Sequence, residues 1–448
     1  MLMSRLTKSG RGFLFVYAAA YAGSASLQKG VGFVLFMWLA HSLSVAEYAR
    51  FGLFYALQTG VAAFALAGIA ESVVGMLKEH HEGPARGTLF AGAFTVFGLL
   101  AVTAAGGALI VYFFMAEKIG ASGRDIAIVT IAGLLSSFFA LQSLFTRLEE
   151  NHGASLSLSF FPPLAGLLGG CLFFLVTPSV SAFYLGMAGG LATTLGVYLI
   201  AGTRFEIWVA GPTPARDIIG RLGPFILIVA LAWLSGYGNT YLVRSFFEAS
   251  DVARFTFAFT LSSIMQLLAS SLNQVWAPKF YRLVHEKTVA VLEQGNRQFY
   301  RLLGLVLGGI GGLVLMVVPV ALGLAGPSMV PYTGMELELF FLFAAYAVSI
   351  PWWNVQNYYL AHSRGREMMF VILATSALGV LVWLTAIWLF GAIGVYAGLA
   401  MMALVRTGGA YLWARRSWPL QTMWEGTLIA CVLLAAGAVA SFAIVQAR

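Results

Sequence analysis

Two stretches decide the fold predicted for this chain: "AEYARFGLFYAL" (residues 46–57) and "SDVARFTFAFTL" (residues 250–261). Each contains an acid, then Ala-Arg-Phe, then an apolar run, so Arg50 and Arg254 hold the same place in the two copies. A repeat half a chain apart indicates two similarly built halves. It also raises the question of why an arginine opens both apolar runs.

The composition is that of a protein that crosses a membrane many times. Of its 448 residues, 60% are hydrophobic and 10% are charged, whereas soluble domains carry about 25% charged residues. A bilayer core about 30 Å thick needs about 20 apolar residues per helix, and apolar runs of that length recur along the chain. We therefore predict an all-α polytopic membrane protein without a soluble domain. The net charge of +8 is attributed to membrane topology and not to nucleic-acid binding.

The apolar runs predict two pseudo-symmetric six-helix lobes and an additional C-terminal helix. Spans one to six form an N-terminal lobe (1–210), a cytoplasmic linker covers 211–221, and spans seven to twelve form a C-terminal lobe (222–414). The additional span lies in 415–448. The predicted spans are 13–40, 51–77, 88–114, 126–148, 154–176, 181–203, 222–246, 252–276, 302–323, 337–361, 368–390, 393–414 and 425–445.

Basic residues predict the orientation of the chain. With a cytoplasmic N-terminus, about 19 Lys and Arg, Arg406 among them, fall in inner segments and about six fall outside, as the positive-inside rule requires. The outer residues are Arg50, Lys118, Arg124, Arg244, Arg254 and Arg448. Six spans separate Arg50 from Arg254, so the two halves point in the same direction and an axis along the membrane normal would relate them.

Arg50 and Arg254 have two interpretations. Each is spaced to pair with an acid three residues earlier on the same helical face, Glu47 or Asp251. The arginines then either anchor the outer ends of their helices at the interface or, through the pseudo-symmetry, line one central opening.

Two further patterns concern packing. Gly304, Gly308 and Gly312 recur at four-residue spacing, which predicts a helix face for close contact with a neighbouring helix. The polar stretch 279–301 predicts a short amphipathic helix on the cytoplasmic membrane surface.

The sequence lacks the motifs of several kinds of chemistry. It has no GxxxxGK[ST] loop for nucleotide hydrolysis and no HExxH or paired Cys/His pattern for a metal. The three aspartates, Asp125, Asp217 and Asp251, are too far apart for a DxD metal site. We therefore expect no ATP use, no metal, no cofactor and no catalytic residues.

Lys29 is the most informative polar residue because it lies near the middle of the first predicted span. A charge inside a membrane costs about 2.5–3.5 kcal/mol on insertion scales, so such a side chain normally faces a bundle interior or a water-filled cavity. Lys29 thus either serves a binding site or forms a structural pair with another buried polar group. Gln28 and the small residues Gly23, Gly30 and Gly32 leave room beside it.

Other polar residues inside the predicted spans have open roles. Glu71 could pair with Lys29, carry a proton or reach the cytoplasmic interface, and Arg244 lies either at the outer interface or in a cavity. Several amides could contact sugar hydroxyls or hydrogen-bond between helices. They are Asn239, Asn273, Gln274, Asn354, Gln356 and Asn357.

The candidate site that these residues define is rich in cations and amides and poor in acids. It comprises Lys29, Arg50, Glu71, Asn239, Arg244, Arg254 and Gln274. Because ammonium and guanidinium groups bind phosphate, the set suits an amphiphilic anion with hydroxyl groups. A lipid diphosphate that carries an oligosaccharide has this chemistry, and an organic anion would need a similar set.

Six stretches, in order along nearly the whole chain, carry a resemblance to a known family. They are "LSVAEYARFGLF" (43–54), "EASDVARFTFA" (248–258), "VWAPKFYRL" (275–283), "MVVPVALGLAGPSMVP" (316–331), "LAHSRGREMM" (360–369) and "FGAIGVYAGLAM" (390–401). In these the chain resembles the Wzx-type flippases, the polysaccharide-transporter branch of the multidrug/oligosaccharidyl-lipid/polysaccharide (MOP) superfamily. The chain departs from the family pattern at Ala49 and Ala253, where Gly is usual, and at Asn239, near a frequent aspartate.

The resemblance implies alternating access and transport of an undecaprenyl-diphosphate-linked glycan, an O-antigen or exopolysaccharide repeat unit, across the bacterial inner membrane. It implies that the first, second, seventh and eighth helices line the cavity. The candidate residues on those helices are Lys29, Arg50, Glu71, Arg244 and Arg254. The implied partners are the polyprenyl-diphosphate-linked glycan, the lipid bilayer, and a polysaccharide polymerase with chain-length proteins.

Three other functions compete with this reading. A drug or organic-ion antiporter of the same fold predicts a carboxylate in the first or seventh span, and neither predicted span contains one. A membrane polysaccharide polymerase or ligase needs a large outer loop with catalytic Arg or His, whereas all predicted outer loops are short. A scaffold without transport activity fits poorly with Lys29 in mid-membrane.

Overall fold

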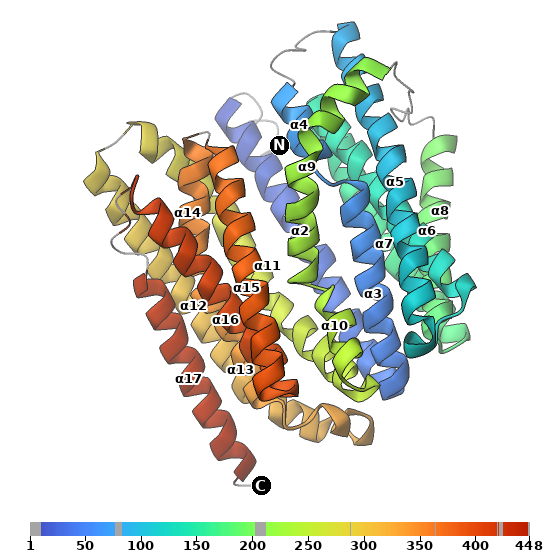
Figure 1. Cartoon of the computed structure of the whole chain (residues 1–448), viewed down its shortest axis with the longest axis vertical. Coiled ribbons are helices and arrows are strands. Elements are labelled where there is room, and N and C mark those ends of the chain that lie inside the picture. The colour runs from blue at the N-terminus through green and yellow to red at the C-terminus, as the bar shows by residue number, and fades with distance from the viewer. Residues whose placement is uncertain are drawn as a thin grey trace, which may run out of the picture. The chain divides into compact units, whose positions relative to one another are not determined.

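The computed structural model describes residues 10–76, 83–201, 212–286, 288–362, 364–418, 420 and 424–446, and this part of the chain is almost entirely helical (Figure 1). The elements are α2 (Gly10–Ser42), α3 (Val45–Ala65), α4 (Ile69–Met76), α5 (Gly83–Ile119), α6 (Gly123–Leu148), α7 (His152–Val176), α8 (Val180–Ile200), α9 (Pro212–Leu234), α10 (Asn239–Phe246), α11 (Ala249–Glu286), α12 (Val289–Leu324), η1 (Pro327–Tyr332), α13 (Glu336–Val348), α14 (Ile350–Ala361), α15 (Gly365–Phe390), α16 (Ala392–Ala414) and α17 (Trp424–Gln446).

The helices match the predicted membrane spans. Within the described residues, 12 helical stretches, from Val45–Val74 to Trp424–Gln446, are long and apolar enough to cross a membrane. Each overlaps one of the predicted spans after the first, although Ala215–Leu234 ends 12 residues before the seventh predicted span does, and the 33-residue helix α2 covers the first, 13–40. The predicted all-α polytopic architecture is confirmed.

The chain divides into two compact units. Unit 1 comprises Met1–Leu35 and Ala46–Leu242, and unit 2 comprises Phe36–Val45 and Val243–Arg448. The predicted linker, 211–221, begins one residue outside the described part, and from Pro212 onward it forms the first turns of α9. Proline suits this place because the first helical N–H groups have no partner within the helix. The boundary between the two sequence repeats stays a prediction.

Three predicted spans are interrupted where glycine or proline weakens the helix. The second span breaks between α3 and α4 at Gly68, whose φ of +73° favours glycine. The seventh breaks over residues 235–238, which include Gly236 and Gly238. The tenth breaks at Ser349, two residues before Pro351 in the first turn of α14. Such breaks release backbone groups from the helical ladder.

The prediction of a short amphipathic helix over 279–301 is wrong. α11 continues to Glu286 and α12 begins at Val289, so the polar stretch is divided between two long helices. Of its apolar residues in α12, Leu292 is buried whereas Val289 and Val291 are exposed, and a separate surface helix does not form.

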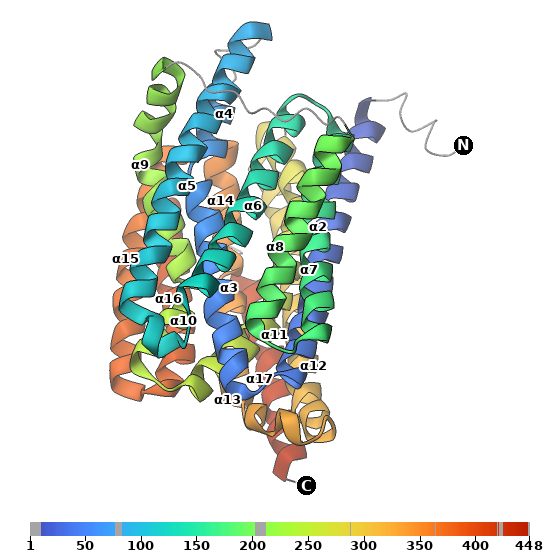
Figure 2. The same ribbon diagram turned by 90° about the vertical axis from the view of Figure 1, so that its right-hand side faces the viewer.

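Helices α6, α7 and α8 lie side by side in unit 1 (Figure 2). Ser143 of α6 and Ser155 of α7 each donate a hydrogen bond to the other's carbonyl oxygen, at 3.0 and 2.8 Å. A Cβ at Gly186 of α8 would lie 2.2 Å from the carbonyl oxygen of Gly169 in α7. Only glycine permits two helix backbones to approach so closely, and this contact fixes the pair α7–α8.

The predicted glycine face of α12 is confirmed, and its partner is the additional C-terminal helix α17. A Cβ at Gly304 would lie 2.2 Å from the carbonyl oxygen of Gly426, and one at Gly312 would lie 2.7 Å from another α17 carbonyl oxygen. At the start of α17, Glu425 forms an ion pair with Arg297 of α12 at 2.7 Å. The additional span is therefore packed against α12 from Glu425 to Gly437.

We expect the substitution Gly304→Ala to lower thermal stability because the added methyl group would meet the α17 backbone. Overpacking of this kind costs about 1–3 kcal/mol. Gly309→Ala is the matched control, since Gly309 lies on the same helix beside open space and alanine favours helix. Thermal unfolding of the purified protein in detergent measures both variants. Equal changes in Tm for the two would contradict the close α12–α17 contact.

Candidate functional site

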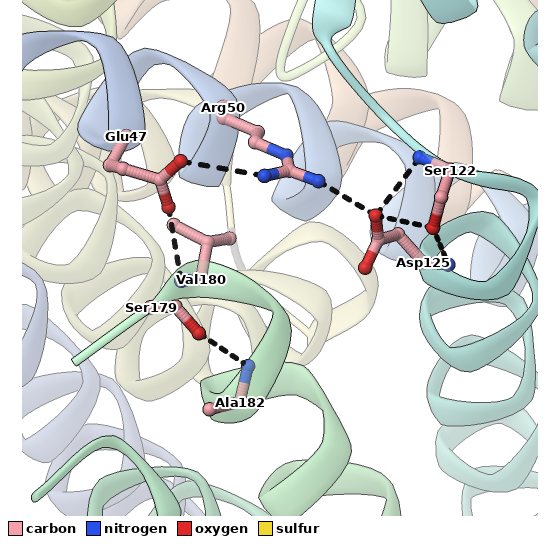
Figure 3. Close-up of polar contacts among 7 residues, drawn as sticks. All are labelled: Glu47, Arg50, Ser122, Asp125, Ser179, Val180 and Ala182. Carbon is pink, nitrogen blue, oxygen red and sulfur yellow. Dashed lines mark hydrogen bonds and ion pairs between the residues drawn. The ribbon is translucent and has the colours of Figure 1, made fainter. Parts of the chain in front are cut away.

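Arg50 lies at the centre of a polar network that joins three helices of unit 1 (Figure 3). Its Nη2 donates to Oδ2 of Asp125 in α6 at 2.7 Å, and its Nη1 donates to Oε1 of Glu47 at 3.4 Å. The other oxygen of Glu47 accepts from the backbone N–H of Val180 at the start of α8, at 3.3 Å. Asp125 also accepts from the backbone N–H and the hydroxyl of Ser122, the residue that caps α6. Arg50 thereby ties the start of α3 to the starts of α6 and α8.

Arg254 forms the corresponding network in unit 2. Its Nη2 donates to Oε1 of Glu338 in α13 at 3.0 Å, and its guanidinium donates to three carbonyl oxygens within residues 331–334 at 3.2–3.3 Å. Asp251 accepts instead from the backbone N–H of Glu248. The predicted i,i+3 pair is thus confirmed for Glu47, whereas Arg254 takes Glu338 in place of Asp251.

The two networks share one design. Asp125 is the third residue of α6 and Glu338 is the third residue of α13. An acid in the first turn also interacts favourably with the positive end of the helix dipole. In each unit an arginine at the start of one helix holds an acid in the first turn of a later helix, which favours the anchoring interpretation of both arginines.

An aromatic contact next to each arginine is repeated as well. The ring of Phe51 lies 6.2 Å from that of Tyr184 in α8, and the ring of Phe255 lies 5.8 Å from that of Tyr396 in α16. Both tyrosines stand two residues before a glycine, within Tyr-x-Gly. The contacts extend the resemblance of the two halves beyond the stretch seen in the sequence.

Lys29 is exposed on α2. Leu27 and Val34 of the same helix are 57% and 65% exposed and lie on one face. At about 100° per residue, Lys29 lies about 150° around the helix from that apolar face. Gly32 lies nearer to the lysine side, and a Cβ there would meet nothing within 4 Å. The ammonium group therefore has open space on a side that differs from the exposed apolar face.

Three other candidate residues lie apart from these networks. Glu71 is exposed in the first turn of α4. Arg244 is half-buried in α10 and donates to the carbonyl oxygen of Phe247 at 3.1 Å. Gln274 belongs to α11, but its side chain lies outside the described residues. Their functional roles stay predictions.

Asn239 lies where the interrupted seventh span is bound to α3. Trp233, before the break, donates to the carbonyl oxygen of Ala56 at 2.9 Å, and Tyr241, after it, donates to that of Leu53 at 2.9 Å. Asn239 itself is fully buried, and its Oδ1 has no hydrogen-bond partner within the described structure. A buried polar atom without a partner costs about 1–3 kcal/mol, so this oxygen is a strained feature of the break.

The amides of unit 2 divide between the two interpretations given to them. Asn357 of α14 donates to Asn273 of α11 at 3.0 Å, so these two hydrogen-bond between helices. Asn354 is buried, and its Oδ1 has no partner in the part of the chain that the structure describes. It is, like Asn239, a buried acceptor without a partner among the described residues.

Arg406 is a polar residue whose position the sequence reasoning missed. The charge count assigns it to an inner segment, but it lies within the spanning helix α16. Its guanidinium lies 6.0 Å from the centre of the Trp352 ring, and its Nε is buried without a hydrogen-bond partner among the described residues. The apolar residues on both sides of it, "GLAMMALVRTGGAYLW" (398–413), could have revealed this place.

Comparison with solved structures identifies the fold. A multidrug-resistance MATE-family transporter of the MOP superfamily, in its inward-facing conformation, matches with a TM-score of 0.67 and 12% identity over 89% of this chain and 94% of that one. The lipid II flippase MurJ, in its inward closed conformation, matches with a TM-score of 0.65 and 11% identity over 95% and 98%. A mutant of the Vibrio cholerae MATE transporter VcmN matches with a TM-score of 0.56 and 15% identity over 93% and 98%.

These matches establish the fold of the MOP-superfamily transporters for this chain. No protein-family profile and no curated protein matches its sequence. At these low identities the similarity concerns the fold alone, so the narrower resemblance to Wzx-type flippases stays a prediction.

The Arg50–Asp125 pair yields a test of the anchoring role. Its side chains are 19% and 9% exposed, so Arg50→Met and Asp125→Asn should each destabilise the protein by about 1–3 kcal/mol, as expected for a hydrogen bond to a charged group. The double variant should lose clearly less stability than the sum of the losses of the two single variants, because both substitutions remove the same interaction. Unfolding in detergent measures the cycle, with Arg147→Met, exposed at the other end of α6, as control. Additive losses would refute the tether.

Proposed function

We propose that the protein is a flippase that moves a polyprenyl-diphosphate-linked oligosaccharide across the bacterial cytoplasmic membrane by alternating access. The observation that carries the proposal is Lys29, a cation on a predicted span that is exposed away from the apolar face of its helix. A charge in such a place is costly and persists where it has a task. A diphosphate supplies the complementary charge and several acceptor oxygens.

The other candidate residues take supporting roles in this proposal. Asn239 and Asn354 offer buried, unpartnered acceptors to sugar hydroxyls. Arg50 and Arg254 hold helices in place and do not bind substrate, because their guanidinium groups are engaged by carboxylates and carbonyl oxygens. With the N-terminus in the cytoplasm, the glycan would enter from the inner leaflet and leave to the outer one, where a polymerase with chain-length proteins would use it.

The second candidate function is a drug or organic-ion antiporter. The structural similarity to MATE transporters favours it as much as the similarity to MurJ favours a flippase. The charge of the candidate site distinguishes the two, since the predicted first and seventh spans contain no carboxylate to attract a cationic drug. An enzymatic role has less support, because the structural neighbours are transporters.

Proteoliposomes that contain the purified protein and a fluorescent polyprenyl-diphosphate oligosaccharide test the proposal. We expect the protein to expose the lipid to a quencher or a glycan-cleaving enzyme added outside, and Lys29→Ala to slow this at least tenfold because the diphosphate loses its ammonium partner. Lys29→Arg should keep part of the rate.

The matched control is Arg216→Ala, which removes an exposed positive charge from the first turns of α9. This variant should move the lipid at a rate within about twofold of that of the unmodified protein. A rate for Lys29→Ala equal to that of the unmodified protein would exclude Lys29 as the substrate contact. Uptake of cationic dyes in the same vesicles, without movement of the lipid-linked glycan, would establish the antiporter instead.

A further inference from the structure

A pocket of about 650 Å³ lies in unit 1, where α6 and α8 begin and α7 ends. It falls within the range of about 300–1,000 Å³ typical of small-molecule sites. The predicted orientation places this end of the three helices at the outer membrane surface. No candidate residue from the sequence lines the pocket, and the proposed transport function makes no use of it.

The free charge in the pocket belongs to Arg124. This arginine is exposed, and it takes part in none of the ion pairs found among the described residues. Asp125 also lines the pocket, but its carboxylate accepts from Arg50 and from Ser122. The start of α8 is likewise engaged, since the hydroxyl of Ser179 accepts from the backbone N–H of Ala182. An incoming ligand therefore meets an unpaired guanidinium.

Polar residues, Thr177 and Ser181 among them, line part of the pocket, and one wall is apolar and continues onto the exposed surface of the helices. Phe173 and Val176 at the end of α7 are 48% and 85% exposed, and Leu185 of α8 is 37% exposed. On spanning helices such side chains face the acyl chains of the bilayer. The pocket thus combines a cation at a helix end with an apolar wall that leads toward the lipid.

We propose that this pocket binds a phospholipid of the bilayer with an anionic headgroup. Its phosphate would lie on Arg124, whose guanidinium can hold phosphate oxygens in a bidentate manner. The upper part of an acyl chain would lie against Phe173, Val176 and Leu185. A lipid in this place bridges α6, α7 and α8 beside the Arg50–Asp125 pair, so its binding stabilises unit 1 regardless of which substrate the protein carries.

Titration of the delipidated full-length protein with phosphatidylglycerol tests this site. Native mass spectrometry gives the affinity of the tightest lipid, and thermal unfolding gives the stabilisation that binding produces. We expect Arg124→Ala to weaken the tightest binding at least tenfold, because the hydrogen bonds from the guanidinium to the charged phosphate are lost. Arg147→Ala, an exposed arginine at the opposite end of α6, should stay within about twofold of the unmodified protein.

Two further experiments distinguish binding of a whole lipid in the pocket from binding of its phosphate alone. Ala182→Trp fills the pocket and should abolish the tightest binding while Arg124 remains. Inorganic phosphate should neither stabilise the protein nor compete at the lipid concentrations used, because it gains nothing from the apolar wall. Equal lipid affinity of the unmodified protein and Arg124→Ala would overturn the proposal, and so would competition by phosphate at the same concentration as the lipid.

Discussion

Each unit depends on an ion pair between an arginine at the start of one helix and an acid in the first turn of a later one. Helices in a membrane gain little hydrophobic energy from one another, so close backbone contact and polar contacts decide how they pack. Glycines supply the close contacts between α7 and α8 and between α12 and α17. The pairs Arg50–Asp125 and Arg254–Glu338 set how far the paired helices are shifted along one another, since each fixes the end of one helix against the end of another.

The offset between the two sequence repeats pairs some residues that are alike and others that differ. The offset of 204 residues between Arg50 and Arg254 also separates Lys29 from Trp233. In both halves the arginine forms an ion pair with an acid of a later helix. The position corresponding to Lys29 holds Trp233, which donates a hydrogen bond to the carbonyl oxygen of Ala56 within unit 1, whereas Lys29 is exposed. A charge present in one half only is not explained by the fold.

Hydropathy was sufficient to predict every span, because an apolar run of membrane length has one stable arrangement. It did not reveal the partners of the arginines, since Asp125 and Glu338 lie 75 and 84 residues further along the chain and only tertiary packing brings them near. The polar stretch 279–301 misled because local composition cannot show where a helix continues. Arg406 was misplaced because a charge count assumes that arginines lie at span ends.

The fold does not decide between drug export and lipid flipping, since transporters of both kinds share it. The charge of the first span does bear on the choice. A carrier of cations needs a carboxylate that is neutralised when the substrate binds, whereas a carrier of a diphosphate needs a cation. This chain has Lys29 in that span and no acid before Glu47. A cation carrier would therefore need a carboxylate from another helix: Asp125 and Glu338 are held by arginines, which leaves the exposed Glu71 of α4 as the candidate acid whose substitution would test this alternative.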